Sequence, residues 1–316
     1  MSTHDPKRLL VAVNPSASFG RHRPVGPVVV DALTKAGHDV HALERSSEGE
    51  LREALRVALG GGALGDAGGA ARPDALVVVG GDGMVSLGTG LVASTGIPLA
   101  LVPTGTGNDF ARALGLPFDD PARAIAQLVT LLDGSPRPVD ALLARGSQGE
   151  TWVAGGVSAG FDALVNERAN RMRRPRGRAR YDIALALELL RLRQVDYEVV
   201  VDGVPQEVAG TLVSVGNARS VGGGITLLPD AVVDDGLLDL LIVDRLSRRA
   251  FLRLFPRVSK GTHGDDPRVR MSRAKTVTIS APGVVAYGDG ERLGPLPIEI
   301  EVVPEALLVY APISTS

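Results

Sequence analysis

Residues Gly80-Gly81-Asp82-Gly83 follow the apolar run Ala75-Leu76-Val77-Val78-Val79. A continuous apolar run of this kind is typical of a buried strand in a parallel sheet. The three glycines allow the backbone to turn sharply and to approach a phosphate, whose charge the N–H groups of such a loop can bind. The Asp82 carboxylate would repel the phosphate unless Mg²⁺ lay between them. The pattern therefore predicts a loop that binds a Mg²⁺–nucleotide complex.

A second strand and a second glycine-rich loop occupy residues 97–110. The strand Ile97-Pro98-Leu99-Ala100-Leu101-Val102-Pro103 leads into Thr104-Gly105-Thr106-Gly107-Asn108-Asp109-Phe110. Thr106 and Asn108 could reach phosphate oxygens, and Asp109 could join a network of metal and water. Asp109 could also cap the helix that follows, and the two roles are compatible. Because open α/β sheets bind ligands at the carboxyl ends of their strands, we expect both loops to face a nucleotide.

The composition is that of a globular protein with room for two domains. The chain has 316 residues, of which 44% are hydrophobic and 22% charged, and a net charge of −2. It contains no cysteine, which excludes a disulfide framework and a Cys-ligated metal. The apolar segment at residues 9–13 is far shorter than that of a signal peptide, and no stretch approaches the ~20 apolar residues of a bilayer span. We expect a cytoplasmic protein that contacts a membrane only peripherally, at its inner face.

A change of pattern near residue 136 predicts two domains. The first part is a βαβ series, with strands at 8–13, 38–43, 75–79 and 97–103 and helices at 28–36, 48–59, 85–94, 109–114 and 121–132. The second part has short β-branched runs typical of a largely antiparallel sandwich, at 198–203, 209–216, 237–243, 276–280 and 298–302. A helical insert at 165–193 interrupts these runs. The expected domains are residues 1–136 with 305–316, and residues 137–304.

Five motifs, taken in order, resemble those of the diacylglycerol kinase catalytic domains, a family of lipid kinases. They are the N-P-x-x-S loop at 14–18, the loops at 80–83 and 103–110, the glycines at 222–224 together with 229–239, and Asp289-Gly290-Glu291. Gly-Gly-Asp-Gly alone also occurs in NAD kinases and phosphofructokinases, so the ordered set carries the resemblance. It covers nearly the whole chain and is similar to soluble bacterial members, with residues 159–193 similar to the actinobacterial, mycobacterial type. It implies a phosphofructokinase-like α/β nucleotide-binding domain followed by an antiparallel β-sandwich.

The resemblance implies roles on the nucleotide side. Asp82 and Asp109 would be catalytic, and the nucleotide would be bound by Asn14, Pro15, Ser16, Ala17, Ser18, Arg45, Gly80, Gly81, Asp82, Gly83, Met84, Thr106 and Asn108. From the residues alone, an ordinary Asn-Pro turn at 14–18 is the lesser alternative, whereas for Arg45 an ordinary solvated arginine is the default interpretation. The family usually has Gly-Gly-Asp-Gly-Thr-x-Asn-Glu, whereas this chain has Met84, Ser86 and Leu87 at the three polar positions. These changes remove polar groups beside the nucleotide.

On the acceptor side the resemblance implies a general base and a metal. Glu291 would take the proton of the lipid hydroxyl, which requires a carboxylate within hydrogen-bond reach of that hydroxyl. Asp235 would hold a structural Mg²⁺ together with the backbone carbonyls of Val232 and Leu237, an all-oxygen set that suits this ion. Asp-Gly pairs at 235–236 and 289–290 also predict plain turns, and at Asp235 the turn is the favoured interpretation from sequence alone.

The helical insert concentrates positive charge. It holds three acidic residues and nine arginines, a net charge of +6: Arg168, Arg171, Arg173, Arg174, Arg176, Arg178, Arg180, Arg191 and Arg193. A basic helix with the apolar stretch 181–190 suits the surface of an anionic membrane. We expect Arg171, Arg173, Arg174 and Arg176 to meet lipid headgroups, the alternative being a solvated basic face over a core helix. Nucleic acid is disfavoured, because no aromatic residues are interleaved for stacking.

The predicted function is an ATP-dependent kinase that uses Mg²⁺ and phosphorylates the free hydroxyl of diacylglycerol to phosphatidic acid in bacterial phospholipid metabolism. Alternatives are a kinase for another amphipathic lipid alcohol, such as a sphingoid base, or a soluble NAD-kinase-like enzyme. Met84 and Leu87 suggest a third, a nucleotide-dependent regulator without activity, against which the intact Asp82, Asp109 and Glu291 argue. The sequence leaves the acyl chains and the oligomeric state open, with a homodimer as one candidate.

Overall fold

The computed structural model describes residues 5–13, 25–60, 72–172, 174–175 and 178–313. The chain divides into two compact units, Met1–Val139 with Glu305–Ser316 and Asp140–Pro304. The division at Val139 lies close to the change of sequence pattern near residue 136. Strand β15 (Ile298–Val309) begins in the second unit and ends in the first. The two units are described separately below.

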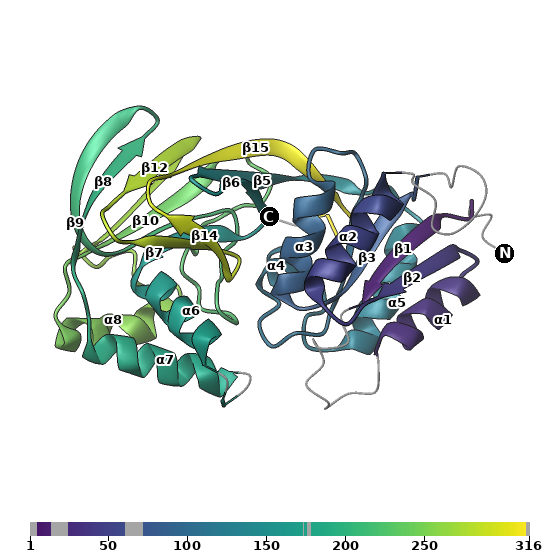
Figure 1. The fold of residues 1–316 in the computed structure, drawn as a ribbon, viewed down its shortest axis with the longest axis horizontal. Helices are drawn as coiled ribbons and strands as arrows, with labels where there is room; N and C mark the ends of the chain where they lie inside the picture. The colour runs from purple at the N-terminus through teal and green to yellow at the C-terminus, as the bar shows by residue number, and fades with distance from the viewer. Residues whose placement is uncertain (1–4, 14–24, 61–71, 173, 176–177, 314–316) are drawn as a thin grey trace. The chain divides into compact units, whose positions relative to one another are not determined.

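A parallel sheet forms the centre of the first unit (Figure 1). Its strands lie in the order β2-β1-β3-β4, with β1 at Arg8–Val13, β2 at Asp39–Glu44, β3 at Ala75–Gly80 and β4 at Leu99–Pro103. The end of β15 lies parallel beside β4, with Val309 opposite Leu99. Every residue of β3 is buried, as expected for a central strand of a parallel sheet. Because Gly80 pairs with Pro103 in the β3–β4 register, the loops that follow these two strands start side by side.

Helices cover both faces of this sheet. They are α1 (Val25–Lys35), α2 (Glu48–Leu59), α3 (Asp82–Val92), the short α4 (Asp109–Ala113) and α5 (Pro121–Leu132). Helices α1 and α5 pack on the face to which Val77 and Val79 point. Gly88 of α3 lies against Val78, which points to the opposite face because side chains alternate along a strand. Helices therefore cover both faces of the central strands, whereas the edge strand β2 stays largely exposed.

The second unit is built from antiparallel strands (Figure 1). The path β14-β13-β7-β9-β8-β12-β15 is completed by β10 beside β9, β11 beside β10, and the β5–β6 hairpin. The bounds are β5 Arg137–Gly146, β6 Gly149–Val153, β7 Gly156–Gly160, β8 Val195–Val201, β9 Val204–Gly216, β10 Leu238–Asp244, β11 Val269–Ala274, β12 Thr276–Ser280, β13 Val285–Gly288 and β14 Glu291–Pro295. Its core gathers inward-facing residues from most of these strands, among them Val199, Val213 and Ile300. This is the β-sandwich-like domain that the sequence predicts.

Three helices accompany these strands: α6 (Phe161–Arg171), α7 (Arg178–Leu190) and α8 (Arg248–Ser259). The insert expected as one helical segment at 165–193 is thus two helices, with Pro175 between them; proline disfavours helical backbone in the residue before it. Helix α8 is absent from the sequence-based expectation. Its Phe251 packs with Phe161 of α6 and with residues of α7, so the three helices share a small core. Among the described residues, no helix is long and apolar enough to cross a membrane.

Candidate active site

The two glycine-rich loops of the first unit touch each other through their backbones. A Cβ atom on Gly81 would lie 2.9 Å from the Cα of Gly105, and a Cβ on Gly105 would lie 2.5 Å from the Cα of Gly81. Both distances are shorter than real side chains tolerate, so any other residue would push the loops apart. The glycines at these two positions are explained by this close approach. A hydrogen bond of 2.9 Å from Thr104 N to Gly80 O joins the same loops.

The Asp82 carboxylate connects the starts of two helices. Its Oδ2 accepts from Asn108 N at 2.9 Å and its Oδ1 from Asp109 N at 2.8 Å. Asp82 is the first residue of α3, and Asp109 is the first residue of α4. A carboxylate offers about four lone-pair positions, so two amide bonds are compatible with a cation on the same group. The structure thus holds the Asp82 carboxylate in one orientation between the two loops.

Asn108 braces the second loop from inside. Its side chain accepts from Gly105 N at 3.0 Å and donates to Gly105 O and Phe118 O at 2.9 and 2.8 Å. The residue is only 3% exposed and has left-handed backbone, with φ +56°. Thr106, in contrast, is exposed at the tip of the loop. The Asn108 side chain therefore fixes the shape of the second loop from inside, while the Thr106 side chain is exposed on its surface.

The unusual residues after the first loop belong to the interior of the unit. Met84 is 4% exposed and lies over Gly80, where an added Cβ would meet the Met84 Cγ at 2.3 Å. Leu87 is fully buried, whereas Ser86 is half-buried. The apolar replacements at 84 and 87 therefore extend the packing of α3 on the sheet, and a nucleotide would meet little of the Met84 side chain.

Other expected nucleotide contacts lie elsewhere. Residues Asn14, Pro15, Ser16, Ala17 and Ser18 fall outside the described residues. Arg45, which follows β2, is exposed, and its Nη1 donates to the carbonyl of Glu44 at 2.8 Å. That local bond is what a solvated arginine would make, so Arg45 carries no argument for or against a nucleotide.

In the second unit, Asp289 clamps a neighbouring loop. Its carboxylate accepts from three consecutive amides, those of Ala154 at 2.8 Å, Gly155 at 2.9 Å and Gly156 at 3.1 Å. Its own backbone is left-handed, with φ +50°, and Gly290 follows with φ +84°. Positive φ at both positions is typical of a tight hairpin turn, here between β13 and β14. The Asp-Gly signal is therefore a turn, and it places Glu291 at the exposed start of β14.

The turn that carries Glu291 lies against the arginine-rich helices. Asn170 of α6 donates through Nδ2 to the carbonyl of Gly290 at 3.3 Å. Tyr287, just before the turn, is buried, and burial is the main cause that raises the pKa of its hydroxyl, with further effects from Glu167 and Arg171 of α6 and from Glu291. The expected general base and the expected lipid-facing insert are therefore neighbours within one unit.

The expected metal loop shows a different ion arrangement. The Asp235 Oδ1 accepts from Leu237 N at 3.1 Å in a local turn, while its Oδ2 lies 3.5 Å from the Nη1 of Arg273. Arg273 also lies 3.4 Å from Asp239. Burial raises the pKa of the Asp239 carboxyl, the Arg273 charge lowers it, and the charges of Asp235 and Asp230 raise it further. The sequence did not single out Asp239 or Arg273, because their pairing depends on the β10–β11 register.

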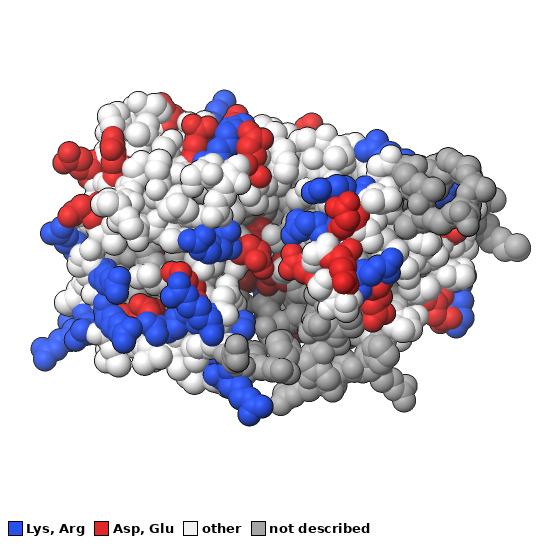
Figure 2. All heavy atoms as spheres, viewed as in Figure 1, with Lys and Arg blue, Asp and Glu red and all other residues white. Residues whose placement is uncertain are grey.

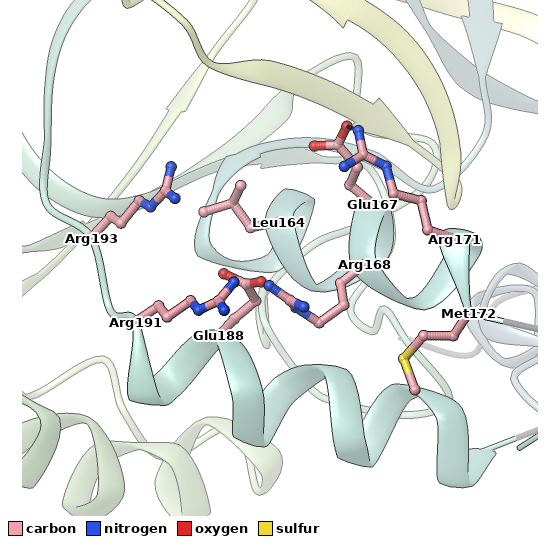
Figure 3. A pocket seen from close by; sticks show the side chains of 8 residues that line it. All are labelled: Leu164, Glu167, Arg168, Arg171, Met172, Glu188, Arg191 and Arg193. Carbon is pink, nitrogen blue, oxygen red and sulfur yellow. Dashed lines mark hydrogen bonds and ion pairs between the residues drawn. The ribbon is translucent and has the colours of Figure 1, made fainter. Parts of the chain in front are cut away.

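The insert contains a charged pocket of about 350 Å³ between α6 and α7, shown in Figure 3. Four arginines line it, Arg168, Arg171, Arg191 and Arg193, together with Glu167 and Glu188. Arg168 pairs with the buried Glu188, and Arg171 pairs with Glu167 at 2.5 Å. Arg171 and Arg174 are exposed, whereas Arg173 and Arg176 lie outside the described residues. Figure 2 shows basic side chains gathered over α6 to α8.

Two family models match this chain. The diacylglycerol kinase catalytic domain matches residues 8–144, and the YegS C-terminal NAD kinase beta sandwich-like domain matches residues 155–311. The first match contains both glycine-rich loops, and the second contains the insert, the metal loop and Glu291. The expected family and the expected two-part fold are confirmed by these matches.

Individual relatives agree with this assignment. A diacylglycerol kinase of Mycobacterium tuberculosis strain H37Rv is 40% identical over 311 residues, which cover 98% of this chain and 96% of the relative. The crystal structure of a diacylglycerol kinase from Bacillus anthracis strain Sterne has a TM-score of 0.72 at 22% identity and covers 99% of this chain and 98% of its own. An NAD kinase from Archaeoglobus fulgidus in complex with ATP has a TM-score of 0.54 at 14% identity, with coverage of 96% and 93%. The last two similarities concern the fold.

Proposed function

The chain belongs to the family of diacylglycerol kinase catalytic domains, and we propose that it transfers the γ-phosphate of ATP to the free hydroxyl of diacylglycerol, giving phosphatidic acid. One observation supports a lipid acceptor above all. The hydrogen bond from Asn170 to the Gly290 carbonyl places the turn of Glu291 against a basic helix pair. A base beside such a surface suits a hydroxyl that reaches the enzyme from a lipid layer.

The first unit would hold the nucleotide phosphates. The touching glycines Gly81 and Gly105 carry no side chains that would keep a phosphate away from the loops. Asp82, fixed by two amides, is the proposed anchor of the Mg²⁺–nucleotide complex, with Asp109 and the exposed Thr106 beside it. Bound Mg²⁺ would neutralise the charge of the phosphate oxygens, which is the main requirement of phosphoryl transfer. The residues supply position and charge, and neither loop forms a covalent bond.

Glu291 is the proposed general base in the second unit. Its carboxylate would accept the proton of the lipid hydroxyl as the hydroxyl oxygen bonds to the γ-phosphorus. The bond from that phosphorus to the bridging oxygen breaks, and ADP leaves with the electron pair. A positioned base typically contributes ~10²–10⁴-fold to the rate. Asp289, which accepts three amides, keeps the turn rigid and so fixes where Glu291 stands.

A structural divalent cation at the loop 230–239 fits the residues present. Asp239 is only 8% exposed, and its buried Oδ2 has no hydrogen-bond partner among the described residues. A buried carboxylate oxygen without a partner is costly, and a hard cation would satisfy it. The proposed ligand set is Asp235 with the carbonyls of Val232 and Leu237, to which the structure adds the buried Asp239 Oδ2, and the ion would tie this loop to the sheet. This part of the proposal is independent of the phosphoryl transfer itself.

We also propose peripheral binding to an anionic membrane through the insert. The outward face of α7 carries Ile183, Leu187 and Leu190, three exposed apolar residues at helical spacing, while Ala184 and Glu188 face inward. Arg248, at the start of α8, donates to the carbonyl of Leu190 at one end of this face, and Figure 2 shows basic side chains gathered over α6 to α8. An apolar stripe within a basic surface is the usual form of a helix that lies in a membrane interface. The first two arginines of α8, Arg248 and Arg249, extend the basic surface beyond the insert predicted from sequence.

The acceptor is tested with γ-labelled ATP and a panel of acceptors in mixed micelles. The panel holds diacylglycerol, monoacylglycerol, a sphingoid base and NAD, with Glu291→Gln as the inactive control. Label in phosphatidic acid, absent with the variant, is the expected result. Label mainly in the sphingoid base or in NAD would replace diacylglycerol by that acceptor, while the family assignment would stand.

The membrane part is tested by sedimentation with anionic liposomes. Neutralising Arg171, Arg173, Arg174 and Arg176 together should weaken binding and flatten its salt dependence, since each basic residue near such a surface contributes ~1 kcal/mol. The matched control neutralises four exposed arginines of the first unit, Arg8, Arg56, Arg72 and Arg123. Equal binding by both variants would leave the insert as a solvated face.

A further inference from the structure

Arg273 reaches three oxygen-bearing residues of the loop 230–239 at once. Its Nη2 donates to the Asp230 carbonyl at 2.9 Å, its Nη1 lies 3.5 Å from the Asp235 Oδ2, and its Nε lies 3.4 Å from the Asp239 Oδ1. Arg273 stands directly opposite Asp239 in the antiparallel β10–β11 register. The sheet itself therefore delivers the guanidinium to the loop, and every guanidinium nitrogen faces one of its oxygens.

This single cation is poorly matched to the oxygens around it. Charge-assisted hydrogen bonds are usually ~2.7–2.9 Å long, so the two carboxylate contacts at 3.4 and 3.5 Å are loose ion pairs. Asp235 and Asp239 together carry two negative charges against one positive charge. The second oxygen of the buried Asp239 has no hydrogen-bond partner among the described residues. The cluster thus has oxygen ligands to spare for a second, smaller cation.

A divalent cation and the guanidinium would need the same oxygens. Mg²⁺ takes oxygen ligands at ~2.0–2.1 Å and Ca²⁺ at ~2.3–2.6 Å, so either would have to draw the two carboxylates together. A guanidinium between those carboxylates prevents that approach. Its partial exposure, with 43% of the side chain accessible, leaves the arginine room to move outward.

From this geometry we propose that Arg273 is a built-in counter-ion of the metal loop, and that Arg273 and a divalent cation occupy the oxygens of Asp235 and Asp239 in exclusion of each other. The inference rests on the metal loop of the proposed function and adds its regulation. With Arg273 in place the loop keeps its shape without metal. The metal enters when the arginine turns away. The wild-type chain therefore needs a higher metal concentration for binding than the same oxygens would need without Arg273.

The experiment measures the melting temperature of the full chain against Mg²⁺ concentration, without nucleotide. A ligand at free concentration c that binds only the folded state stabilises it by RT ln(1 + c/Kd), so the melting temperature rises once the ligand concentration exceeds Kd. Arg273→Met keeps the apolar stem and removes the competing charge. It should melt lower than wild type in EDTA, and Mg²⁺ should stabilise it at a concentration about tenfold lower. The control is Arg270→Met, on the same strand as Arg273. It removes the exposed 2.9 Å ion pair between Arg270 and Asp244 of β10 and should leave the Mg²⁺ dependence unchanged.

Counting bound metal provides a second readout that does not depend on the melting temperature. Equilibrium dialysis with Mn²⁺ alone should show tighter binding of one ion to Arg273→Met than to wild type. Adding Asp239→Asn to that variant should remove the gain. Equal Mn²⁺ and Mg²⁺ responses of Arg273→Met and wild type would overturn the exclusion and reduce Arg273 to a cross-strand ion pair.

The same experiment separates this inference from the function it builds on. If the double variant Arg273→Met, Asp235→Ala responds to metal as Arg273→Met does, the loop binds no metal and the inference is wrong together with the structural metal site. Phosphoryl transfer would be untouched by that result, because it rests on Asp82 and Glu291. A failed acceptor assay with an intact metal response would instead leave the inference standing and remove the lipid substrate.

Discussion

Asp82 of the first unit and Asp289 of the second unit each precede a glycine in a loop, and the two loops use their aspartates differently. Asp82 accepts one amide on each carboxylate oxygen, from Asn108 and Asp109 of the loop beside it. Asp289 accepts three amides in a row, from residues 154–156, and holds its own backbone at φ +50°. Hydrogen bonds to a charged acceptor typically contribute ~1.5–3 kcal/mol each. Asp289 therefore stabilises a turn, while Asp82 joins the two glycine-rich loops of the first unit.

Under the proposed function, the chemistry of the second loop belongs to Glu291, a neighbour of its aspartate. The Asp289 carboxylate is directed at a strand connection, and the residue left on the surface is Glu291. In the first loop no other carboxylate lies within the four residues, and Gly80, Gly81 and Gly83 can contribute only backbone. The comparison predicts that changes at Asp82 and Glu291 affect catalysis, whereas changes at Asp289 affect stability first.

The largest effect is expected at Asp82. Asp82→Ala should abolish turnover, because the Mg²⁺–phosphate complex loses its proposed anchor. Since the same change releases two loop amides, Asp82→Asn is the sharper variant: it keeps an acceptor oxygen and should retain the wild-type circular dichroism spectrum while losing activity. Steady-state kinetics with γ-labelled ATP measure the loss. A folded Asp82→Asn protein with a near-wild-type rate would contradict the nucleotide-site assignment.

Glu291→Gln should lower kcat by ~10²–10⁴-fold with little change in the KM for ATP. Glutamine keeps the size of the side chain but cannot take the proton of the lipid hydroxyl. The matched control is Glu198→Gln, an exposed strand glutamate of the same unit, which should keep the wild-type kcat. If the loss appeared only in ATP affinity, Glu291 would belong to the nucleotide side, and an unimpaired kcat would leave 289–291 as a hairpin turn alone.

Asp289→Ala should lower the free energy of unfolding by ~3 kcal/mol or more, because three loop amides lose their acceptor. Urea denaturation followed by circular dichroism measures the change. At a temperature where the variant is folded, its kcat should fall less than that of Glu291→Gln. Wild-type stability in Asp289→Ala would show that the amides find other partners and that the clamp is unimportant.

The smallest effect is expected at Asp162, whose charged carboxylate is destabilised by burial. Burial raises the pKa of its carboxyl from 3.8 to about 6, although Ser158 and the Ala163 amide oppose the shift. A pKa raised by folding means that the contribution to stability is complete below 3.8 and is lost as the pH rises through about 6. Asp162→Asn should therefore melt above wild type at pH values well above 6. The two melting curves should converge below pH 3.8, and a gap that widened on acidification would contradict the burial argument.

Much of the fold follows from local sequence. Strands β1 and β12 and helices α2 and α5 have the bounds that their residues predict, since apolar period, end caps and strand runs are local properties. Ser47 and Asp120 cap the two helices as their types suggest. Helix α8 was missed because Pro256 lies inside it and its arginines hide the apolar spacing of Phe251, Leu254 and Phe255. The break between α6 and α7 was missed although Pro175 marks it.

The candidate site divides in the same way. Glycine-rich loops at strand ends, and the carboxylates Asp82, Asp109 and Glu291, could be chosen from the sequence because their types and neighbours are local signals. The sequence could not predict that Asn108 faces inward or that Met84 covers Gly80, because both facts depend on what packs against each side chain. The sequence also indicated turns at 235–236 and 289–290 without saying which partners their aspartates would meet.

What the sequence alone determined is therefore the family, the two-part fold, the elements of the first unit and the residues able to do chemistry. Only the tertiary structure decided that Asp289 is a clamp, that Asn170 joins the insert to the Glu291 turn, and that Arg273 lies on the loop 230–239. These pairs are far apart in the chain and meet through strand register and helix packing. A local pattern cannot encode them, because whether two distant side chains meet depends on the path of all the chain between them.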